Sequence, residues 1–196
     1  MKNMLFIMNP KAGRTTLKNS LVDVLEVFCN NDYAVRTYLT KSADDAERIV
    51  QEEGANYDVI VCAGGDGTLG NTVTGYMKSG IKVPLGYIPC GSTNDFARSM
   101  DIPRETVEAA EMIVKAEPFS IDIGSLNDKN FVYVAAFGMF SDTSYATPQN
   151  MKNIFGHAAY VLQGIKSLAN VPSYKMKVTI DGDEQEGEFI FGTVSY

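Results

Sequence analysis

The sequence predicts an α/β protein with a mostly parallel sheet flanked by helices, followed by the start of an antiparallel, β-rich region. Two observations carry this prediction. Up to Pro118, short apolar runs alternate with amphipathic stretches of helical period, which is typical of strands and helices that build a parallel sheet. After Pro118 the chain shows short strand-like runs separated by turn signals. We therefore expect two domains, at residues 1–123 and 124–196.

Each predicted strand of the first region is an apolar run that is followed directly by a polar or glycine-containing loop. The strands are expected at residues 4–8, 34–39, 59–63 and 84–88. The stretches between and after them repeat apolar residues at helical spacing, so each predicts a helix that buries one face. These helices are expected at 17–28, 44–53, 69–80 and 96–100, with a further helix that starts at Pro103.

The second region reads as strands at 119–126 and 131–136, a helix at 152–169, and a hairpin. The hairpin joins strands 174–180 and 186–194 around the turn Asp181-Gly182-Asp183-Glu184. The last of these strands is expected to lie unpaired, because no residues follow Tyr196 that could pair with it. We therefore expect the chain to be a fragment of a longer protein.

Composition narrows the classes of function. A net charge of −7 with no basic stripe argues against a nucleic-acid footprint and against strong attachment to acidic lipid. The three cysteines have no metal-ligand spacing, which suits a reducing cytoplasm. No apolar run approaches the ~20 residues of a membrane span.

Four unusual loops follow the four predicted strands of the first region, at residues 9–14, 40–42, 64–68 and 89–95. Because each follows a strand of one parallel sheet, all four are expected at its C-terminal edge, where open α/β sheets bind ligands. Polar and glycine-rich loops that converge there are far less expected by chance than a single such loop.

The loop Gly64-Gly65-Asp66-Gly67-Thr68 lies between a predicted strand and a predicted helix. Such a turn lets backbone N–H groups approach an anion closely, with a helix N-terminus behind them. The carboxylate of Asp66 indicates a cation as well, since it would otherwise repel a phosphate. A glycine-rich turn without a ligand remains the alternative. The stretch 65–70 matches a dinucleotide fingerprint, but no acid ends the following strand to hold a ribose.

Three blocks of sequence together resemble the diacylglycerol kinase catalytic-domain family, which includes bacterial lipid kinases and sphingosine kinases and is distantly similar to NAD kinases. The blocks are Asn9-Pro10-Lys11-Ala12-Gly13, Gly64-Gly65-Asp66-Gly67-Thr68 and the run from Pro89 to Arg98. The middle block is shared with NAD kinases. The third, with Asn94-Asp95-Phe96-Ala97-Arg98, is similar to the lipid kinases.

The resemblance implies a kinase that moves the γ-phosphoryl group of ATP to a hydroxyl of diacylglycerol or a related lipid. It also implies Mg²⁺ bound through ATP, without a direct set of protein ligands beyond Asp66 or Asp95. These two acids are the catalytic candidates, and the family's general base is expected beyond Tyr196. The expected nucleotide-binding residues are Asn9, Pro10, Lys11, Ala12, Gly13, Thr40, Gly64, Gly65, Asp66, Gly67, Thr68, Leu69, Gly70, Asn71 and Ser92.

Arg14, Arg98 and Asp122 are expected to support the charge balance of the site. Several alternatives stay open at this point. Lys11 and Arg14 also fit solvated loop charges, Asp95 also fits a helix N-cap, and Asp122 also fits a strand-end carboxylate. The family usually has Asn-Glu where this chain has Gly70-Asn71, so the nucleotide contacts there can differ.

Two other functions remain open on the sequence: a nucleotide-binding module without catalysis, and an enzyme similar to NAD kinases. The resemblance also implies a cytoplasmic protein with a lipid substrate, with peripheral membrane contact and a homo-oligomer both compatible, and no nucleic-acid partner.

Overall fold

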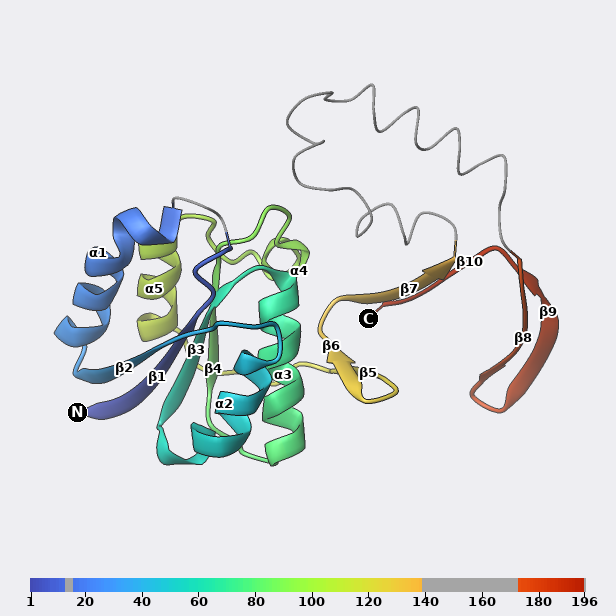
Figure 1. Ribbon diagram of the computed structural model, residues 1–196, viewed down its shortest axis with the longest axis horizontal. Coiled ribbons are helices and arrows are strands. Elements are labelled where there is room, and N and C mark those ends of the chain that lie inside the picture. Colours follow the sequence, from blue (N-terminus) through green and yellow to red (C-terminus); the bar gives the residue numbers. More distant parts are fainter. Residues whose placement is uncertain (13–15, 139–172, 196) are drawn as a thin grey trace, which may run out of the picture. The chain divides into compact units, whose positions relative to one another are not determined.

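The computed structural model describes residues 1–12, 16–138 and 173–195 (Figure 1). The described chain forms two compact units, Met1–Tyr133 and Val134–Tyr196. The helix expected at 152–169 lies outside the described residues. The functional domain boundary expected after residue 123 stays a prediction. The first compact unit of the structure extends ten residues further, to Tyr133.

The first unit is built on a parallel sheet of four strands in the order β2-β1-β3-β4. The strands are β1 (Lys2–Met8), β2 (Tyr33–Leu39), β3 (Val59–Gly64) and β4 (Leu85–Pro89). In the central strand, Met4 pairs with Val35 on one side and with Val59 on the other. The predicted strands and their parallel arrangement are confirmed.

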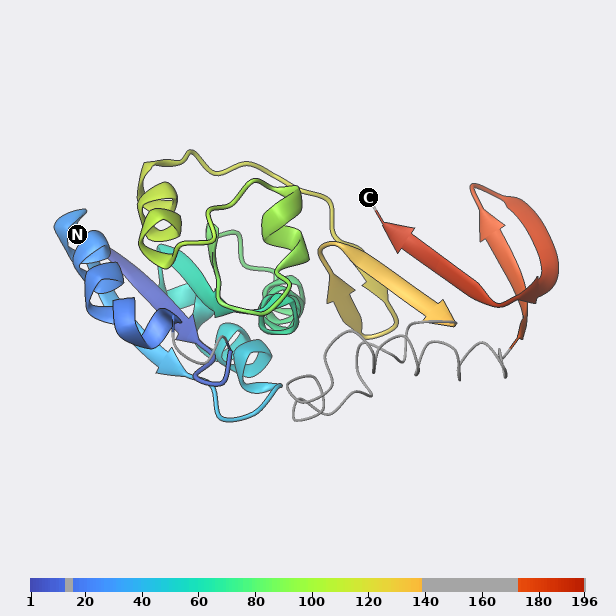
Figure 2. The same cartoon turned by 90° about the horizontal axis from the view of Figure 1, so that it is seen from above.

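Helices cover both faces of this sheet (Figures 1 and 2). On one face, α1 (Thr16–Asn30) and α5 (Thr106–Lys115) pack on Phe6 and Val61. On the other face, α2 (Asp45–Glu53) and α3 (Asp66–Ser79) pack on Leu5, Ile60 and Cys62. Successive side chains of a strand point to opposite faces, so β1 supplies both halves of the core. The 3₁₀ turn η1 (Gly54–Asn56) and the short helix α4 (Asp95–Ser99) complete the α/β part.

Two helices begin at other residues than expected. α3 begins at Asp66, directly after the glycine turn, rather than at Leu69. α5 begins at Thr106 rather than at Pro103, because the Glu105 carboxylate caps it by accepting hydrogen bonds from the N–H groups of Val107 (2.8 Å) and Glu108 (3.2 Å).

Of the strand expected at 119–126 only residues 124–126 form a strand, and the strand expected at 131–136 is divided between a strand that ends at Phe131 and another that begins at Val134. β5 (Gly124–Leu126) and β6 (Lys129–Phe131) form a small antiparallel hairpin. This hairpin packs on α3, where the N–H of Asn130 donates to the Thr74 hydroxyl at 3.1 Å. Residues 129–131, which were expected in a turn and at the start of a strand, thus pair with residues 124–126 beside α3.

The second unit contains two antiparallel pairs of strands. β8 (Tyr174–Ile180) and β9 (Asp183–Phe189) form the expected hairpin, but its turn is only Asp181-Gly182, both with positive φ. The strand expected at 186–194 breaks at Ile190. Its second half, β10 (Phe191–Ser195), pairs with β7 (Val134–Gly138), so the prediction of an unpaired last strand is wrong.

Across the described residues, no helix has both the length and the apolar character that crossing a bilayer requires.

Candidate active site

The loops after β1 and β3 meet at the switch point of the sheet. β1 is followed along the chain by β2 on one side, while β3 on its other side leads to β4, and such a reversal opens a crevice at the strand ends. Asn9, directly after the end of β1, connects to the loop after β3. Its side-chain amide donates to the Thr68 hydroxyl (3.0 Å), and its N–H donates to the Ala63 carbonyl (3.0 Å). The Asn9 side-chain oxygen also accepts from the N–H of Lys11 (2.9 Å), so one residue joins the first and third loops.

The glycine turn and the loop after β4 touch through their backbones. A Cβ on Gly64 would lie 2.5 Å from Cβ of Thr68, and a Cβ on Gly91 would lie 2.6 Å from Cα of Gly65. The N–H of Cys90 donates to the Gly64 carbonyl at 2.7 Å. Glycine is therefore required at Gly64 and Gly91 by packing alone.

Gly67 is different. It lies in the first turn of α3, and a Cβ built there would meet no described atom within 4 Å. Its φ is not in the left-handed region, so neither backbone conformation nor packing within the described chain requires a glycine. The N–H groups of Thr68 and Leu69 in this turn donate to the Gly65 carbonyl (2.9 and 3.0 Å). A helix N-terminus with open space beside it suits a phosphate that approaches the backbone.

Asn94 and Tyr87 hold the loop after β4 in place. Asn94 adopts a left-handed conformation (φ 52°), and its amide both accepts from the N–H of Gly91 (2.8 Å) and donates to the Gly91 carbonyl (2.9 Å). The buried Tyr87 hydroxyl donates to the Gly64 carbonyl (3.1 Å) and lies 3.4 Å from the Asn94 side-chain oxygen. Burial, with a smaller effect of the nearby Asp66 charge, raises the pKa of Tyr87 far above its usual range. The phenol therefore stays protonated and remains a donor.

Tyr87 was not among the residues expected in the site. Its position in an apolar strand indicates a residue that packs in the core. Only the hydrogen bond to Gly64 in the folded structure shows that the Tyr87 hydroxyl links two loops.

The two candidate carboxylates stand at the starts of neighbouring helices. Asp66 opens α3, and its Oδ1 accepts from the N–H of Phe96 in the first turn of α4 (3.3 Å). Asp95 is the first residue of α4, and the N-cap position belongs to Asn94, so the alternative of Asp95 as N-cap is wrong. Both carboxylates are half-buried. Asp66 thus joins the glycine turn to α4 through one oxygen and keeps the other for a further partner.

The remaining expected nucleotide-binding residues are placed as follows. Thr40 is buried, and its N–H donates to the Met8 carbonyl at 2.9 Å. Asn71 donates from its amide to the Ala43 carbonyl at 2.8 Å, which ties α3 to the loop after β2. Leu69 packs its side chain in the core, so only its backbone can face a ligand. Pro10, Lys11 and Ser92 are exposed, while Ala12 and Gly70 are half-buried. Gly13 and Arg14 lie outside the described residues.

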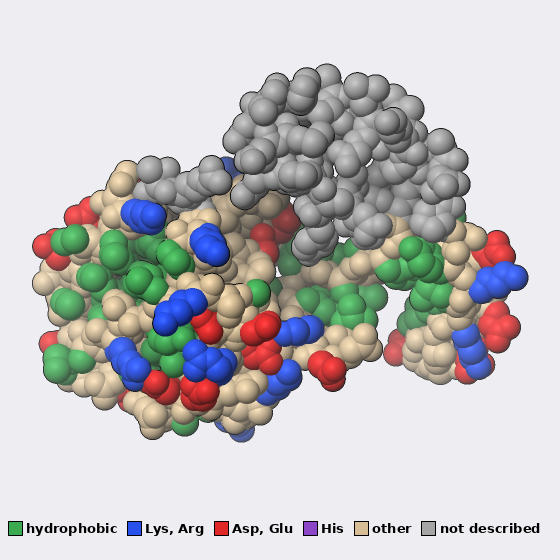
Figure 3. Space-filling view, in the orientation of Figure 1, with side chains coloured by type: hydrophobic (Ala, Val, Ile, Leu, Met, Phe, Trp, Pro, Cys, Tyr) green, Lys and Arg blue, Asp and Glu red, His purple; other side chains and the backbone are tan. Residues whose placement is uncertain are grey.

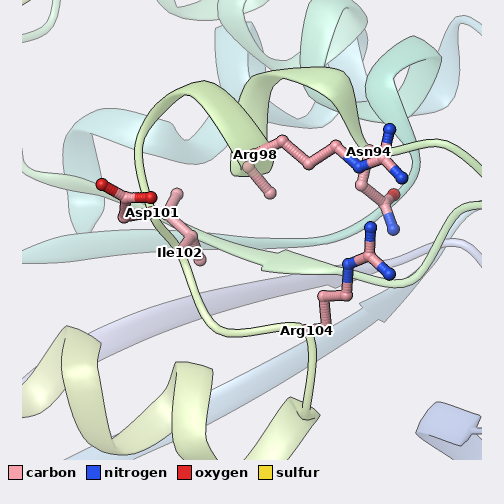
Figure 4. Close-up of a pocket in the computed structure, with 6 residues that line it drawn as sticks. Asn94, Arg98, Asp101, Ile102 and Arg104 are labelled. Carbon is pink, nitrogen blue, oxygen red and sulfur yellow. The ribbon is translucent and has the colours of Figure 1, made fainter.

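Asp122 is exposed, and its neighbours Ile121 and Ile123 pack on the cluster of Leu69, Tyr87 and Phe96. No contact joins its carboxylate to the four loops among the described residues. Arg98 is exposed on α4 beside Asn94, and Arg104 lies close to it (Figure 4). In the space-filling view, basic and acidic side chains are interspersed on the visible face of the first unit (Figure 3).

The buried thiols contribute no nucleophile. Burial raises the pKa of Cys62 and of Cys90 to about 12 each, so both stay protonated near neutral pH. Within the described ranges, no group of three or more histidine, cysteine or acidic side chains could hold a metal ion by itself.

Comparisons with known proteins agree with this geometry. The sequence profile described as the diacylglycerol kinase catalytic domain matches residues 3–126. The diacylglycerol kinases of Staphylococcus aureus strains JH9 and Newman are each 35% identical over 191 residues, which cover 95% of this chain and 60% of theirs. The chain thus spans about 60% of the length of these curated relatives.

Solved structures agree as well. A crystal structure of a putative diacylglycerol kinase from Bacillus anthracis strain Sterne matches with a TM-score of 0.82 and 29% identity, over 99% of this chain and 64% of that one. A second diacylglycerol kinase structure from the same strain matches with a TM-score of 0.79 and 28% identity, over the same shares of the two chains. Because the profile matches residues 3–126, more than half of this chain, the chain belongs to the diacylglycerol kinase catalytic-domain family.

Proposed function

We propose that the protein transfers the γ-phosphoryl group of ATP to the hydroxyl of diacylglycerol or a related lipid. Membership of the family and the names of its relatives support a lipid kinase. The single observation that carries the proposal is the open space beside Gly67 in the first turn of α3, where a Cβ would meet no described atom within 4 Å. Phosphoryl transfer relies chiefly on positioning and charge stabilisation, which a rigid frame of backbone donors supplies.

In this proposal each loop has a separate task. Asn9 and Thr68 hold the floor of the crevice, and the N–H groups of the α3 N-terminus bind the phosphates. Lys11, Arg14 and Arg98 neutralise phosphate charge. The general base is expected beyond Tyr196, so no residue described here takes that role.

The residues present fit a magnesium ion that arrives with the nucleotide. Mg²⁺ in kinase sites is typically held by one or two carboxylates, substrate phosphates and water rather than by an all-protein cage. Asp66 keeps one carboxylate oxygen free of the Phe96 N–H, and Asp95 lies one residue before Phe96. When bound, the ion would neutralise the charge that develops on the transferred phosphoryl group.

The remaining assignments belong to the same proposal. Residues 124–196 form part of the lipid-substrate domain, and Asp122 contributes to the charge balance near the site. The protein acts in the cytoplasm on a lipid that it meets at the membrane surface, with phospholipid metabolism as its setting. A homo-oligomer is compatible with these assignments.

The test is Asp66→Asn, assayed by radiolabel transfer from ATP to extracted lipid with the complete reading frame expressed. The amide keeps an oxygen for the Phe96 N–H, so we expect a folded protein by circular dichroism that has lost phosphoryl transfer. Asp58→Asn is a matched control, because the Asp58 carboxylate also accepts one backbone N–H, that of Asn3 (2.7 Å), at the opposite edge of the sheet. Near-normal transfer by Asp66→Asn would mean that Asp66 only shapes the turn.

A further inference from the structure

A pocket lies beside the glycine loops, between α4 and the segment that leads to α5. Its volume is about 280 Å³, and it is lined by Asn94, Ala97, Arg98, Asp101, Ile102 and Arg104. Arg104 belongs to none of the sequence blocks that indicated a nucleotide site. The pocket therefore adds a cationic side chain that the proposed function has not used.

The two arginines of the pocket converge. Figure 4 shows the guanidinium groups of Arg98 and Arg104 beside the Asn94 amide, while the carboxylate of Asp101 points away from them. Within the described ranges, neither guanidinium takes part in an ion pair or a side-chain hydrogen bond. Like charges that face one space repel each other, and an anion between them would reverse the sign of that interaction.

The frame of the pocket is held by backbone contacts. The N–H of Ile102 donates to the Ala97 carbonyl (2.9 Å), and Asp101 adopts a left-handed conformation (φ 51°) that turns the chain back after α4. The Asn94 amide is tied to Gly91 on both sides, so the wall of the pocket continues the loop that touches the glycine turn. The arginines are thus carried by an ordered scaffold next to the proposed phosphate site.

We propose that Arg98 and Arg104 form a phosphate subsite that binds a phosphomonoester or a terminal nucleotide phosphate. Guanidinium forks match phosphate oxygens in two parallel hydrogen bonds, and two of them suit a dianion better than a single negative charge. The biological role of the subsite rests on the proposed phosphoryl transfer, in which such a group is present both in the nucleotide and in the phosphorylated product.

The experiment is calorimetric titration of the full chain with three probes: inorganic phosphate, glycerol 3-phosphate and ADP. Glycerol 3-phosphate is titrated both alone and with ADP at saturation. The variants are Arg98→Gln, Arg104→Gln and Arg104→Lys. Lys82→Gln is the matched control, since it removes one positive charge from an exposed position before β4, at the other edge of the sheet.

We expect Arg104→Gln and Arg98→Gln each to weaken binding of the phosphate probe by about tenfold or more, as the loss of a hydrogen bond to a charged group implies. Arg104→Lys should recover only part of the affinity because it lacks the fork, and Lys82→Gln should bind as the wild type does. Circular dichroism checks that each variant is folded.

The probes also distinguish the two sources of phosphate. Glycerol 3-phosphate that binds beside saturating ADP, and is lost in Arg104→Gln, supports a subsite for the phosphorylated product. Competition with ADP, together with weaker ADP binding by Arg104→Gln, supports a subsite for the nucleotide. Unchanged affinity of folded Arg98→Gln and Arg104→Gln for all three probes would overturn the inference. That result also removes Arg98 from the charge balance, but it leaves the proposed phosphoryl transfer standing if wild type still binds Mg-ATP and Asp66→Asn is still inactive.

Discussion

Two glycines of the site, Gly91 and Gly67, meet different physical demands: one of the fold and one of the proposed ligand. At Gly91 a Cβ would meet the backbone of Gly65 at 2.6 Å, whereas at Gly67 it would meet nothing within 4 Å. A methyl group at Gly67 should therefore be harmless to the fold and should obstruct only what binds there. This separates a glycine that the packing requires from one that the proposed phosphate requires.

We predict that Gly67→Ala keeps or gains stability, by up to about 1 kcal/mol from helix propensity, and weakens Mg-ATP binding about tenfold or more. Gly91→Ala should instead lose about 1–3 kcal/mol, because the backbone of Gly65 has to move. Urea unfolding and nucleotide titration measure the two effects. Wild-type affinity in Gly67→Ala would show that no phosphate approaches this turn.

Tyr87 provides a second prediction for a single residue. Tyr87→Phe removes the donor to the Gly64 carbonyl, which keeps its hydrogen bond from the Cys90 N–H, so the expected loss of stability is about 0.5–1.5 kcal/mol. Because the hydroxyl links two site loops, nucleotide affinity should fall as well. Tyr76→Phe is the control: it loses a similar bond to the Val83 carbonyl (2.8 Å), remote from the site, and should change stability alone. Equal nucleotide affinity in both variants would contradict a positioning role for Tyr87.

At the scale of secondary-structure elements, an ionic network holds α2, α3 and the β5-β6 hairpin together. The Glu47 carboxylate accepts from Lys78 (2.8 Å) and Lys129 (2.7 Å), and these two lysines, Lys129 first, lower its pKa. Because folding lowers this pKa, the carboxylate contributes stability above its ordinary pKa of 4.5, and this contribution is lost as the pH falls through the lowered value.

We predict that Lys129→Ala costs about 0.5–1 kcal/mol at pH 7, since exposed ion pairs rarely contribute more. The difference from wild type should shrink in acid, where Glu47 is protonated, and in high salt. Lys115→Ala is the control: its pair with Glu111 (2.8 Å) lies within one exposed helix, and it should cost less. Chemical unfolding at pH 7 and in acid measures both. A difference that persists below the lowered pKa of Glu47 would contradict the ionic origin of the effect.

At the scale of the whole molecule, nucleotide binding and lipid phosphorylation are expected to separate. The four loops of the first unit lie within Met1–Tyr133, while the resemblance to the family implies a general base beyond Tyr196. Residues 1–196 expressed alone should therefore bind Mg-ATP, with a stabilisation of roughly 2.7 kcal/mol at a hundredfold excess over the dissociation constant. They should phosphorylate no lipid, because a missing base alone costs ~10²–10⁴-fold.

Thermal melting of residues 1–196 with Mg-ATP, with NAD and without ligand measures nucleotide binding. Lipid phosphorylation is compared between residues 1–196 and the complete reading frame. A melt raised by NAD but not by Mg-ATP would favour a dinucleotide binder. Lipid phosphorylation by residues 1–196 within tenfold of the complete reading frame would place the base among the described residues, with Asp95 and Asp122 tested first.

The sequence by itself determined the order of the elements and the presence of four loops at one edge of the sheet. Both follow from local patterns: strands and helices bury one face with a fixed period, and each loop directly follows its strand. Only the tertiary structure placed β1 between β2 and β3, so that Asn9 meets Thr68 across the switch point. It also decided that β5 pairs with β6 beside α3 and that β10 pairs with β7. The Tyr87 link to Gly64 and the convergence of Arg104 with Arg98 were equally beyond local pattern, because contacts between distant residues depend on how the packed faces meet in space.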